Sequence, residues 1–326
     1  MRPDVTRWLD RRTSHAGDWP LERLKAIKGK TRVSVVIPAL DEEVTIGAIV
    51  ETIRTDLMSG ANPLVDEIVV MDSGSLDATV QVAAEAGATV VMREDVLENV
   101  PPVPGKGEVL WRSLAATGGD LLVFIDGDLE AFSSSVVTGL LGPLLTDRSV
   151  ALVKGLYDRP LRDGSQVLRS GGGRVTELVA RPLLNLHWPE LSGVVQPLVG
   201  EYAARRGLLE QLPFPTGYGV ELAILVDTLA IAGLDAIAQV DLGVRLHRHQ
   251  DDAALGRMAA EIWQTALRRL DPAGRTLRPH GLGATLAQFE REDGVFVARV
   301  HDVSTTERPP IQQLEAYALG LRRAAS

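Results

Sequence analysis

The first 155 residues alternate between short β-branched, apolar runs and longer segments with helical spacing, and this alternation constrains the fold most. The expected strands span residues 32–37, 65–71, 89–92, 121–125 and 150–154. The expected helices between them span residues 42–53, 77–86, 107–116 and 133–145. Such alternation is typical of βαβ units, so the sequence predicts an α/β fold with a mostly parallel sheet.

The second half of the chain is less regular and richer in Gly and Pro. Its clearest expected helices span residues 176–186, 220–232 and 253–270. From residue 271 turn formers are frequent, and we expect a loosely structured tail that includes the segment RPP at 308–310. The predicted regions are an N-terminal extension (1–30), a first half (31–155), a second half (156–270) and a C-terminal tail (271–326).

Composition excludes several classes of protein. A chain of 326 residues, 45% of them hydrophobic, can bury a large core in one or two domains. The 34 Lys and Arg against 43 Asp and Glu give a net charge of -9, which argues against a nucleic-acid-binding surface. Without Cys there is no disulfide, thiolate zinc site or cysteine nucleophile. We see no signal-peptide pattern and no stretch of membrane-spanning length, so we expect a cytoplasmic protein.

The apolar run 121–125 ends directly in the triplet DGD at 126–128. In open α/β sheets, ligands bind beyond the carboxyl ends of the strands. Two carboxylates placed there can share Mg²⁺ or Mn²⁺, which in turn binds substrate phosphates. Taken alone, the triplet is more often a simple turn. Its weight as a candidate site depends on the other loops that end at the same edge.

Three other loops follow expected strands or open expected helices. PALDEE (38–43) and DSGS (72–75) follow the first two strands, and either could simply cap the next helix. In GKG (105–107), a lysine between two glycines opens a helix and suits an anionic ligand, the alternative being an exposed turn lysine. Because parallel strands end at the same edge, we expect these loops to gather beside DGD.

Taken together, these loops resemble the nucleotide-sugar half of a GT-A glycosyltransferase. Further motifs are GGGRVTEL (171–178), QPL (196–198), GYGVE (217–221), GVRLHR (243–248) and RPP (308–310). With them the chain resembles the actinobacterial glucosyl-3-phosphoglycerate synthases over about residues 33–250, and the mannosyl-3-phosphoglycerate synthases are close relatives. The resemblance implies a GT-A fold, with a Rossmann-like, mostly parallel sheet, a nucleotide-sugar-binding first half and an acceptor-binding second half.

The resemblance also implies three groups of binding residues. Those for the nucleotide sugar are Pro38, Ala39, Leu40, Glu42, Ser73, Lys106, Asp126, Gly127 and Arg245. Those for Mg²⁺ or Mn²⁺ are Asp128 and His247. Those for the acceptor are Gly173, Arg174, Thr176 and His249. His249 departs from the family, which carries asparagine there; a histidine could still donate a hydrogen bond, with added pH dependence.

The implied reaction is retaining transfer of glucose from UDP-glucose to the 2-hydroxyl of 3-phosphoglycerate. The implied catalytic residues are Glu221, which orients sugar hydroxyls, Thr176 and the backbone carbonyl of Leu198. The enzyme would be a homodimer without nucleic-acid or membrane partners, in glucosylglycerate or methylglucose lipopolysaccharide biosynthesis. The sequence leaves open UDP or GDP, and glucose or mannose (a mannosyl-3-phosphoglycerate synthase using GDP-mannose). It also leaves open a metal-dependent nucleotidyltransferase, a non-catalytic sugar-nucleotide-binding protein and the role of the loop at 156–171.

Overall fold

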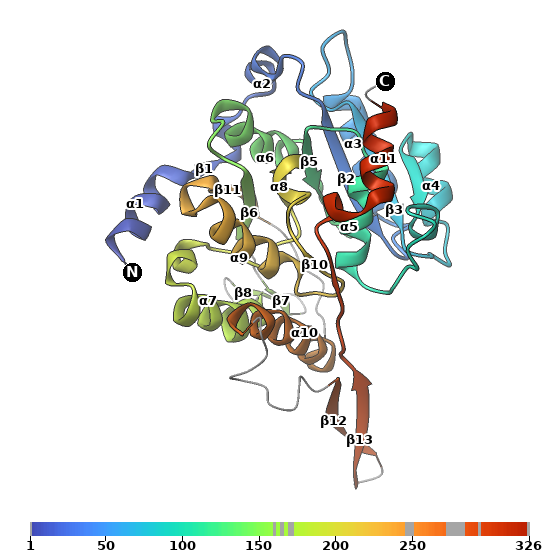
Figure 1. Ribbon diagram of the computed structural model, residues 1–326, viewed down its shortest axis with the longest axis vertical. Coiled ribbons are helices and arrows are strands. Elements are labelled where there is room, and N and C mark those ends of the chain that lie inside the picture. The colour runs from blue at the N-terminus through green and yellow to red at the C-terminus, as the bar shows by residue number, and fades with distance from the viewer. Residues whose placement is uncertain are drawn as a thin grey trace.

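An eight-stranded sheet forms the centre of the molecule, with strand order β1-β11-β6-β9-β5-β2-β3-β4 (Figure 1). The computed structural model describes residues 2–158, 161–163, 166–168, 173–244, 251–271, 284–292 and 295–324. The strands of this sheet are β1 (Thr13–His15), β2 (Val33–Ala39), β3 (Glu67–Asp72), β4 (Thr89–Met92), β5 (Leu121–Phe124), β6 (Leu152–Asp158), β9 (Tyr202–Arg205) and β11 (Ile237–Val244). Neighbouring strands are parallel except β9, which is antiparallel to both β5 and β6. The predicted α/β fold with a mostly parallel sheet is confirmed.

Helices cover both faces of the sheet, which is why its central strands are nearly continuous apolar runs. One core cluster includes residues of α2 (Leu21–Lys28), α3 (Ile46–Leu57), α4 (Thr79–Ala86) and α6 (Ser135–Thr146). The other includes residues of α1 (Pro3–Arg12), α5 (Lys106–Ala116), α7 (Arg181–His187), α8 (Arg206–Leu209), α9 (Val220–Ala232), α10 (Asp252–Leu270) and α11 (Glu315–Ala324). A π-helical turn, Thr176–Ala180, leads into α7. The expected helices are therefore present, with boundaries shifted by a few residues.

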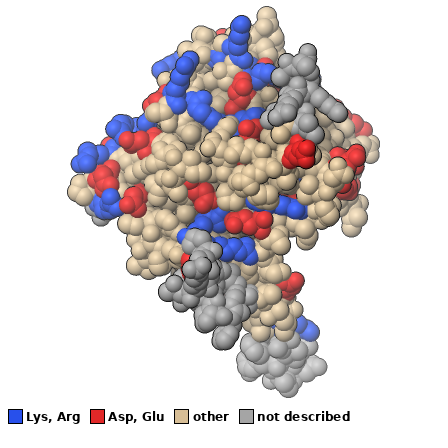
Figure 2. All heavy atoms as spheres, viewed as in Figure 1, with Lys and Arg blue, Asp and Glu red and all other residues tan. Residues whose placement is uncertain are grey.

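The N-terminal extension adds an edge strand to the sheet. β1 pairs in parallel with β11, and the buried Trp8 donates from its indole nitrogen to the carbonyl of Ile237 at 2.9 Å. Within the loop at 156–171, β7 (Leu161–Asp163) pairs with β8 (Gln166–Leu168). Among the described residues, no helix has both the length and the apolar character needed to cross a membrane. Acidic and basic side chains are interspersed over the face seen in Figure 2.

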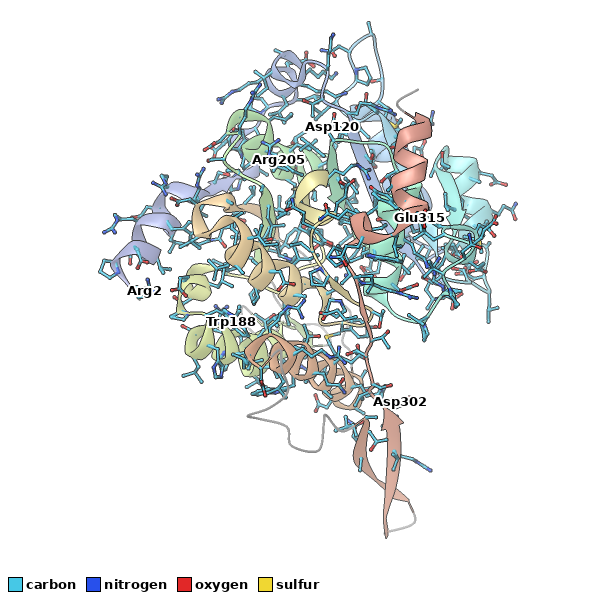
Figure 3. The ribbon with its side chains drawn as sticks, in the orientation of Figure 1. Arg2, Asp120, Trp188, Arg205, Asp302 and Glu315 are labelled. Atoms are coloured by element: carbon cyan, nitrogen blue, oxygen red, sulfur yellow. The ribbon has the colours of Figure 1, made fainter. Side chains whose placement is uncertain are left out.

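The prediction of a loosely structured tail is wrong. β12 (Thr285–Glu292) and β13 (Val295–Asp302) form a hairpin that projects from the body (Figure 1). Beyond it, β14 (Glu307–Arg308) pairs with β10 (Phe214–Pro215), and α11 begins at Glu315 (Figure 3). The turn residues that suggested a loose tail connect regular elements, whose pairing partners include a segment about ninety residues earlier.

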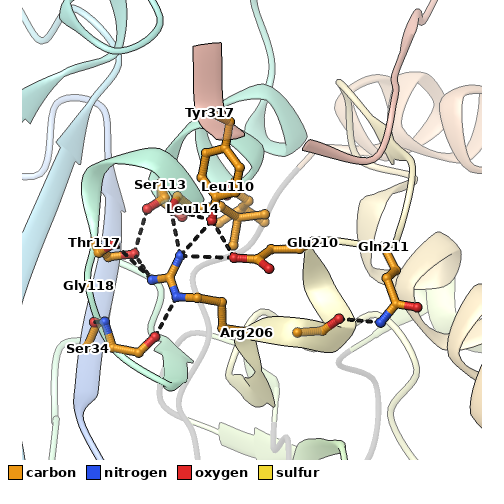
Figure 4. Close-up of polar contacts among 12 residues, drawn as sticks. Ser34, Leu110, Ser113, Leu114, Thr117, Gly118, Arg206, Glu210, Gln211 and Tyr317 are labelled. Carbon is orange, nitrogen blue, oxygen red and sulfur yellow. Dashed lines mark hydrogen bonds and ion pairs between the residues drawn. The ribbon is translucent and has the colours of Figure 1, made fainter. Parts of the chain in front are cut away.

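Arg206 binds several backbone carbonyls at the C-terminal end of α5. Arg206, at the start of α8, donates to the backbone carbonyls of Leu114, Thr117 and Gly119 at 2.7, 3.0 and 2.6 Å. It also donates to the hydroxyl of Tyr317 on α11 at 3.1 Å (Figure 4). Five guanidinium donors in a planar fork can satisfy several helix-end carbonyls at once. The first residue of α5 is Lys106, one of the predicted nucleotide-sugar-binding residues.

Candidate active site

The loops after β2 and β3 are joined by hydrogen bonds at the carboxyl edge of the sheet. The Asp72 carboxylate accepts from the backbone of Gly74 and Ser75 at 2.7 and 2.9 Å and from the Ser75 hydroxyl at 2.5 Å. The Ser75 hydroxyl in turn accepts from the backbone N–H of Asp41 at 3.0 Å. Asp41 adopts a left-handed backbone conformation with φ of 58°. These two acids therefore shape the loops.

The predicted nucleotide-sugar residues Pro38, Ala39, Glu42, Ser73 and Gly127 are brought together at this edge. The backbone N–H of Ser73 donates to the Ala39 carbonyl at 3.0 Å. Gly127 lies against the loop after β2, because a Cβ there would be 3.1 Å from the Pro38 carbonyl and 3.4 Å from Glu42. The triplet DGD thus contacts the PALDEE loop directly. Leu40, also in the PALDEE loop, is exposed, with 54% of its surface accessible.

Two glycines allow the first turn of α5 to approach the chain that leads into α9. Gly105 has φ of 119°, and a Cβ there would lie 2.2 Å from the carbonyl of Thr216. A Cβ on Gly107 would lie 1.9 Å from the carbonyl of Pro215. Any side chain at either position would force the two segments apart. The GKG motif is therefore a packing requirement that sets the place of Lys106.

Lys106 joins the two halves of the predicted site. Its ammonium lies 2.8 Å from a carboxylate oxygen of Asp126, after β5, and 2.9 Å from one of Glu221, in the first turn of α9. Burial acts to lower the pKa of Lys106, but the two carboxylates outweigh it and hold that pKa well above its usual value. Lys106 therefore stays cationic. Through it, the carboxylate of Glu221, a residue that is 4% exposed, is held close to that of Asp126.

The turn that carries Leu198 also contacts Asp126. A Cβ on Gly200 would lie 2.3 Å from both carboxylate oxygens of Asp126, so only glycine allows this approach. At the start of the turn, Gln196 exchanges hydrogen bonds with the backbone of Tyr157 at the end of β6. Sequence reasoning missed Gly200, since nothing in its immediate neighbours distinguishes it from an ordinary loop glycine.

Three of the predicted acceptor residues, Gly173, Arg174 and Thr176, lie on one segment. Gly173 has φ of 82° and accepts from the backbone N–H of Glu177 at 3.0 Å, which starts the helical turn. Arg174 forms an ion pair with Asp252 at the start of α10, and its side chain is 33% exposed. Thr176 is buried, with 6% of its surface accessible. A guanidinium beside a glycine-opened helical turn can bind an oxyanion.

The predicted metal site is only partly described. Asp128 is exposed at the carboxyl edge, and carboxylate oxygens are the donors that Mg²⁺ and Mn²⁺ prefer, so this residue fits the ion. His247, the second predicted ligand, lies outside the described residues, as do Arg245 and His249, because the described part of β11 ends at Val244. Within the described ranges, no group of three or more His, Cys, Asp or Glu side chains is placed to hold a metal.

Known proteins are similar to this chain in sequence and fold. The family Glycosyl transferase family 2 matches residues 34–171. A glucosyl-3-phosphoglycerate synthase of Mycolicibacterium smegmatis is 50% identical over 308 residues, covering 94% of this chain and 98% of the relative. One from Petrotoga mobilis is 42% identical and covers 95% of each chain.

A crystal structure agrees with these sequence matches. Glucosyl-3-phosphoglycerate synthase from Mycobacterium tuberculosis, in complex with Mn²⁺, UDP-glucose and phosphoglyceric acid, matches with a TM-score of 0.80 at 46% identity. The match covers 92% of this chain and 97% of that one. The relatives are similar in sequence over nearly the whole chain, and they have the same fold. The chain belongs to the glucosyl-3-phosphoglycerate synthase family of glycosyltransferases.

Proposed function

We propose that this protein transfers glucose from UDP-glucose to the 2-hydroxyl of 3-phosphoglycerate, with retention of the anomeric configuration and with Mg²⁺ or Mn²⁺. The observation that carries the proposal is the contact of Lys106 with both Asp126 and Glu221. It places an acid of the acceptor-binding half beside the acids of the nucleotide-sugar-binding half. A group-transfer enzyme needs such a meeting point, because donor and acceptor must react at one carbon.

Relatives support the choice of substrates. Solved structures of the Mycobacterium tuberculosis relative contain UDP-glucose with phosphoglyceric acid, or UDP with glucosyl-3-phosphoglycerate, each together with Mn²⁺. These are a donor with an acceptor and the corresponding pair of products. At 46% identity over 92% of this chain, the relative is close enough for the same substrates to be the first to test.

The bond changes follow from the substrates. The bond between the glucose anomeric carbon and the diphosphate oxygen breaks, and a bond from that carbon to the acceptor oxygen forms. The acceptor proton passes to the departing diphosphate on the same face of the sugar, so the donor configuration is kept. Glu221 orients the sugar hydroxyls, while the Leu198 carbonyl and the Thr176 hydroxyl position the acceptor. Preorganised polar groups of this kind lower the barrier because they need not reorient during reaction.

Charged side chains bind the two anionic substrates. Asp128 and His247 would hold the divalent metal, which supplies charge neutralisation at the diphosphate when bound. Lys106 and Arg245 add positive charge there, and the loops after β2 and β3 bind the nucleoside. On the acceptor side, Arg174 binds the phosphate or carboxylate of 3-phosphoglycerate, assisted by Gly173 and His249.

A matrix of donors and acceptors with the purified protein tests the proposal. UDP-glucose, GDP-glucose and GDP-mannose are each combined with 3-phosphoglycerate and with glycerate, with Mn²⁺ or with a chelator. We expect glucosyl-3-phosphoglycerate only with UDP-glucose, 3-phosphoglycerate and metal, and an α-anomeric signal by NMR. Turnover with GDP-mannose alone would assign the protein to mannosyl transfer. Pyrophosphate release from a nucleoside triphosphate would assign it to nucleotidyl transfer.

Two further properties belong to the proposal and rest on the family resemblance. The protein is a homodimer, and it acts in the cytoplasm on metabolites of glucosylglycerate or methylglucose lipopolysaccharide biosynthesis. Light scattering coupled to size-exclusion chromatography checks the first, since a dimer has twice the 35.1 kDa of one chain. Fractionation of cells into membrane and cytosol checks the cytoplasmic location.

A further inference from the structure

Lys154 is a buried cation that no part of the proposed mechanism uses. It lies on β6 in the middle of the sheet, paired in register with Tyr202 of β9 and Gln239 of β11, and is 1% exposed. Its ammonium donates to the carbonyl of Val199 at 2.7 Å and lies 4.8 Å from the centre of the Tyr202 ring. Burial lowers its pKa to about 8, against the opposing influence of Glu221.

The carbonyl that Lys154 binds belongs to the turn with Leu198. Val199 follows Leu198 directly, and Gly200 follows next, packed against the carboxylate of Asp126. The peptide between Val199 and Gly200 is therefore held on one side by the ammonium of Lys154 and limited on the other by Asp126. In this way the turn keeps a fixed place relative to the strand-edge acids.

The turn 196–200 is joined to the rest of the protein mainly at its ends. Inside the turn, the backbone N–H of Val199 donates to the Gln196 carbonyl at 3.3 Å, which closes the turn on itself. At its start the Gln196 side chain bonds to the backbone of Tyr157, and after it the backbone N–H of Gly155 donates to the carbonyl of Glu201 at 2.9 Å. The contact from Lys154 is charge-assisted and reaches the residue next to Leu198. A buried ammonium is costly, and an apolar side chain could fill the same space at lower cost. The contact therefore points to a positional role.

We infer that Lys154 is a positioning residue, which holds the turn 196–200 against Asp126 and thereby sets where the acceptor meets the sugar. The inference rests on the proposed function, because it acts through the acceptor role given to Leu198. It predicts a specific defect: without Lys154 the turn moves, and the acceptor is bound less well. We expect the Kd for UDP to change little, because Lys154 is hydrogen-bonded to this turn and not to the loops after β2 and β3.

The chain offers a matched control in Lys28. Its ammonium is also buried, donates to a backbone carbonyl (Pro63, 2.8 Å) and lies 2.7 Å from Asp66. Lys28 and Asp66 are at the amino ends of β2 and β3, opposite the edge with the candidate site. Replacing either lysine removes a buried cation and one carbonyl contact. We expect only replacement of Lys154 to change the turn, because Lys28 does not contact it.

The experiment compares Lys154→Met, Lys154→Arg and Lys28→Met with wild type. The readouts are the melting temperature, the Kd for UDP with Mn²⁺, and the KM for each substrate in the transfer of glucose from UDP-glucose to 3-phosphoglycerate. For Lys154→Met we expect the KM for 3-phosphoglycerate to rise about tenfold or more, the usual scale of a lost charge-assisted hydrogen bond, with the Kd for UDP unchanged within about twofold. Lys154→Arg keeps the charge and should give an intermediate KM. Lys28→Met should lower the melting temperature and leave both KM values unchanged.

Other results overturn the inference. An unchanged KM for 3-phosphoglycerate in Lys154→Met, or equal changes for both substrates, would make Lys154 a structural residue only. If Lys154→Met does not fold, Lys154→Arg decides, because a change of equal size in the KM of both substrates, or in that of UDP-glucose alone, contradicts the inference. Wild-type protein that transfers no glucose to 3-phosphoglycerate would instead refute the proposed function, and the inference with it.

Discussion

Negative charge gathers where the diphosphate of the donor would bind. Asp126, Asp128 and Glu221 supply three carboxylates, and the cation of Lys106 is already shared by two of them. A nucleoside diphosphate adds further negative charge, which like charges at short range oppose. At the scale of single residues, the site therefore needs a divalent cation.

The Asp128→Ala variant tests this need for metal. We expect turnover to be abolished, because one of the two predicted protein ligands is lost and the diphosphate charge is left uncompensated. Glucose transfer is measured over a range of Mn²⁺ concentrations, with Glu85→Ala, an exposed acid on α4, as the control. Activity of Asp128→Ala equal to that of wild type, with or without a chelator, would show that no metal is held there.

The Arg174→Ala variant tests the acceptor site. Loss of a charge-assisted pair costs roughly 1.5–3 kcal/mol, so the KM for 3-phosphoglycerate should rise about tenfold to a hundredfold while that for UDP-glucose changes little. Asp252→Asn is the matched variant, because it removes the acid that pairs with Arg174 and keeps the guanidinium. It should bind the acceptor as well as wild type or better. A shift in the donor KM would reassign Arg174 to the diphosphate.

The Glu221→Gln variant separates an orienting role from a covalent one. Glutamine keeps the shape of the side chain but loses the charge that faces Lys106. We expect a loss of about 10²–10³-fold in kcat, comparable to that of one preorganised electrostatic contact, with an α-linked product and no rescue by azide. Complete loss with azide rescue, or a glycosyl adduct on Glu221 seen by mass spectrometry, would establish a covalent intermediate.

At the scale of elements, α5 is held at both ends by segments distant in sequence. Arg206 binds the carbonyls at its C-terminal end, and Arg308 binds the fully buried Glu108 near its start at 2.7 Å. The Arg308 guanidinium also lies 5.3 Å from the ring of Trp111, whose indole N–H donates to the Pro309 carbonyl at 3.0 Å. The RPP segment, noticed in the sequence for its resemblance to the family, is thus a brace for the helix that starts with Lys106.

The Arg308→Met variant measures that brace. One oxygen of the buried Glu108 loses its partner while Arg112 still binds the other at 2.7 Å. Breaking a buried pair costs about 3–5 kcal/mol, so with one partner kept we expect the free energy of unfolding in urea to fall by about 2–4 kcal/mol. The double variant Arg308→Met with Glu108→Gln should lose less, because the remaining side chain is uncharged. Equal stability of wild type and Arg308→Met would mean that α5 needs no brace.

The sequence predicted the elements that depend on local pattern. The apolar runs of β2 and β5 and the helices between them could be predicted because both faces of the sheet are buried. The triplet DGD and Lys106 were found because strand-end acids and a glycine-flanked lysine have a local signature. Lys154 and Gly200 have no such signature, since their contacts depend on β9 and on a turn brought in from the second half. The prediction of a loosely structured tail was wrong for the same reason: β14 is ordered by pairing with β10, which is distant in the sequence.

At the scale of the whole molecule, the two predicted halves share one sheet. β6 pairs with β9 and β11, and β5 pairs with β9 and β2, so strands from both halves alternate across the centre. The two predicted halves, which meet near residue 155, are therefore not separate layers of structure. A change in β9 alters the candidate site from both sides, because it lies between the strand of Asp126 and the strand of Lys154.

The place of β9 also has a consequence for synthesis on the ribosome. β5 and β6 are complete by residue 158, yet they cannot pair with each other, because residues 202–205 must enter between them. A nascent chain of intermediate length therefore exposes two unpaired apolar sheet edges, the kind of surface that recruits chaperones or aggregates. Released fragments that end before residue 202 should be insoluble. The central sheet can therefore form only after β9, which is synthesised late, has left the ribosome.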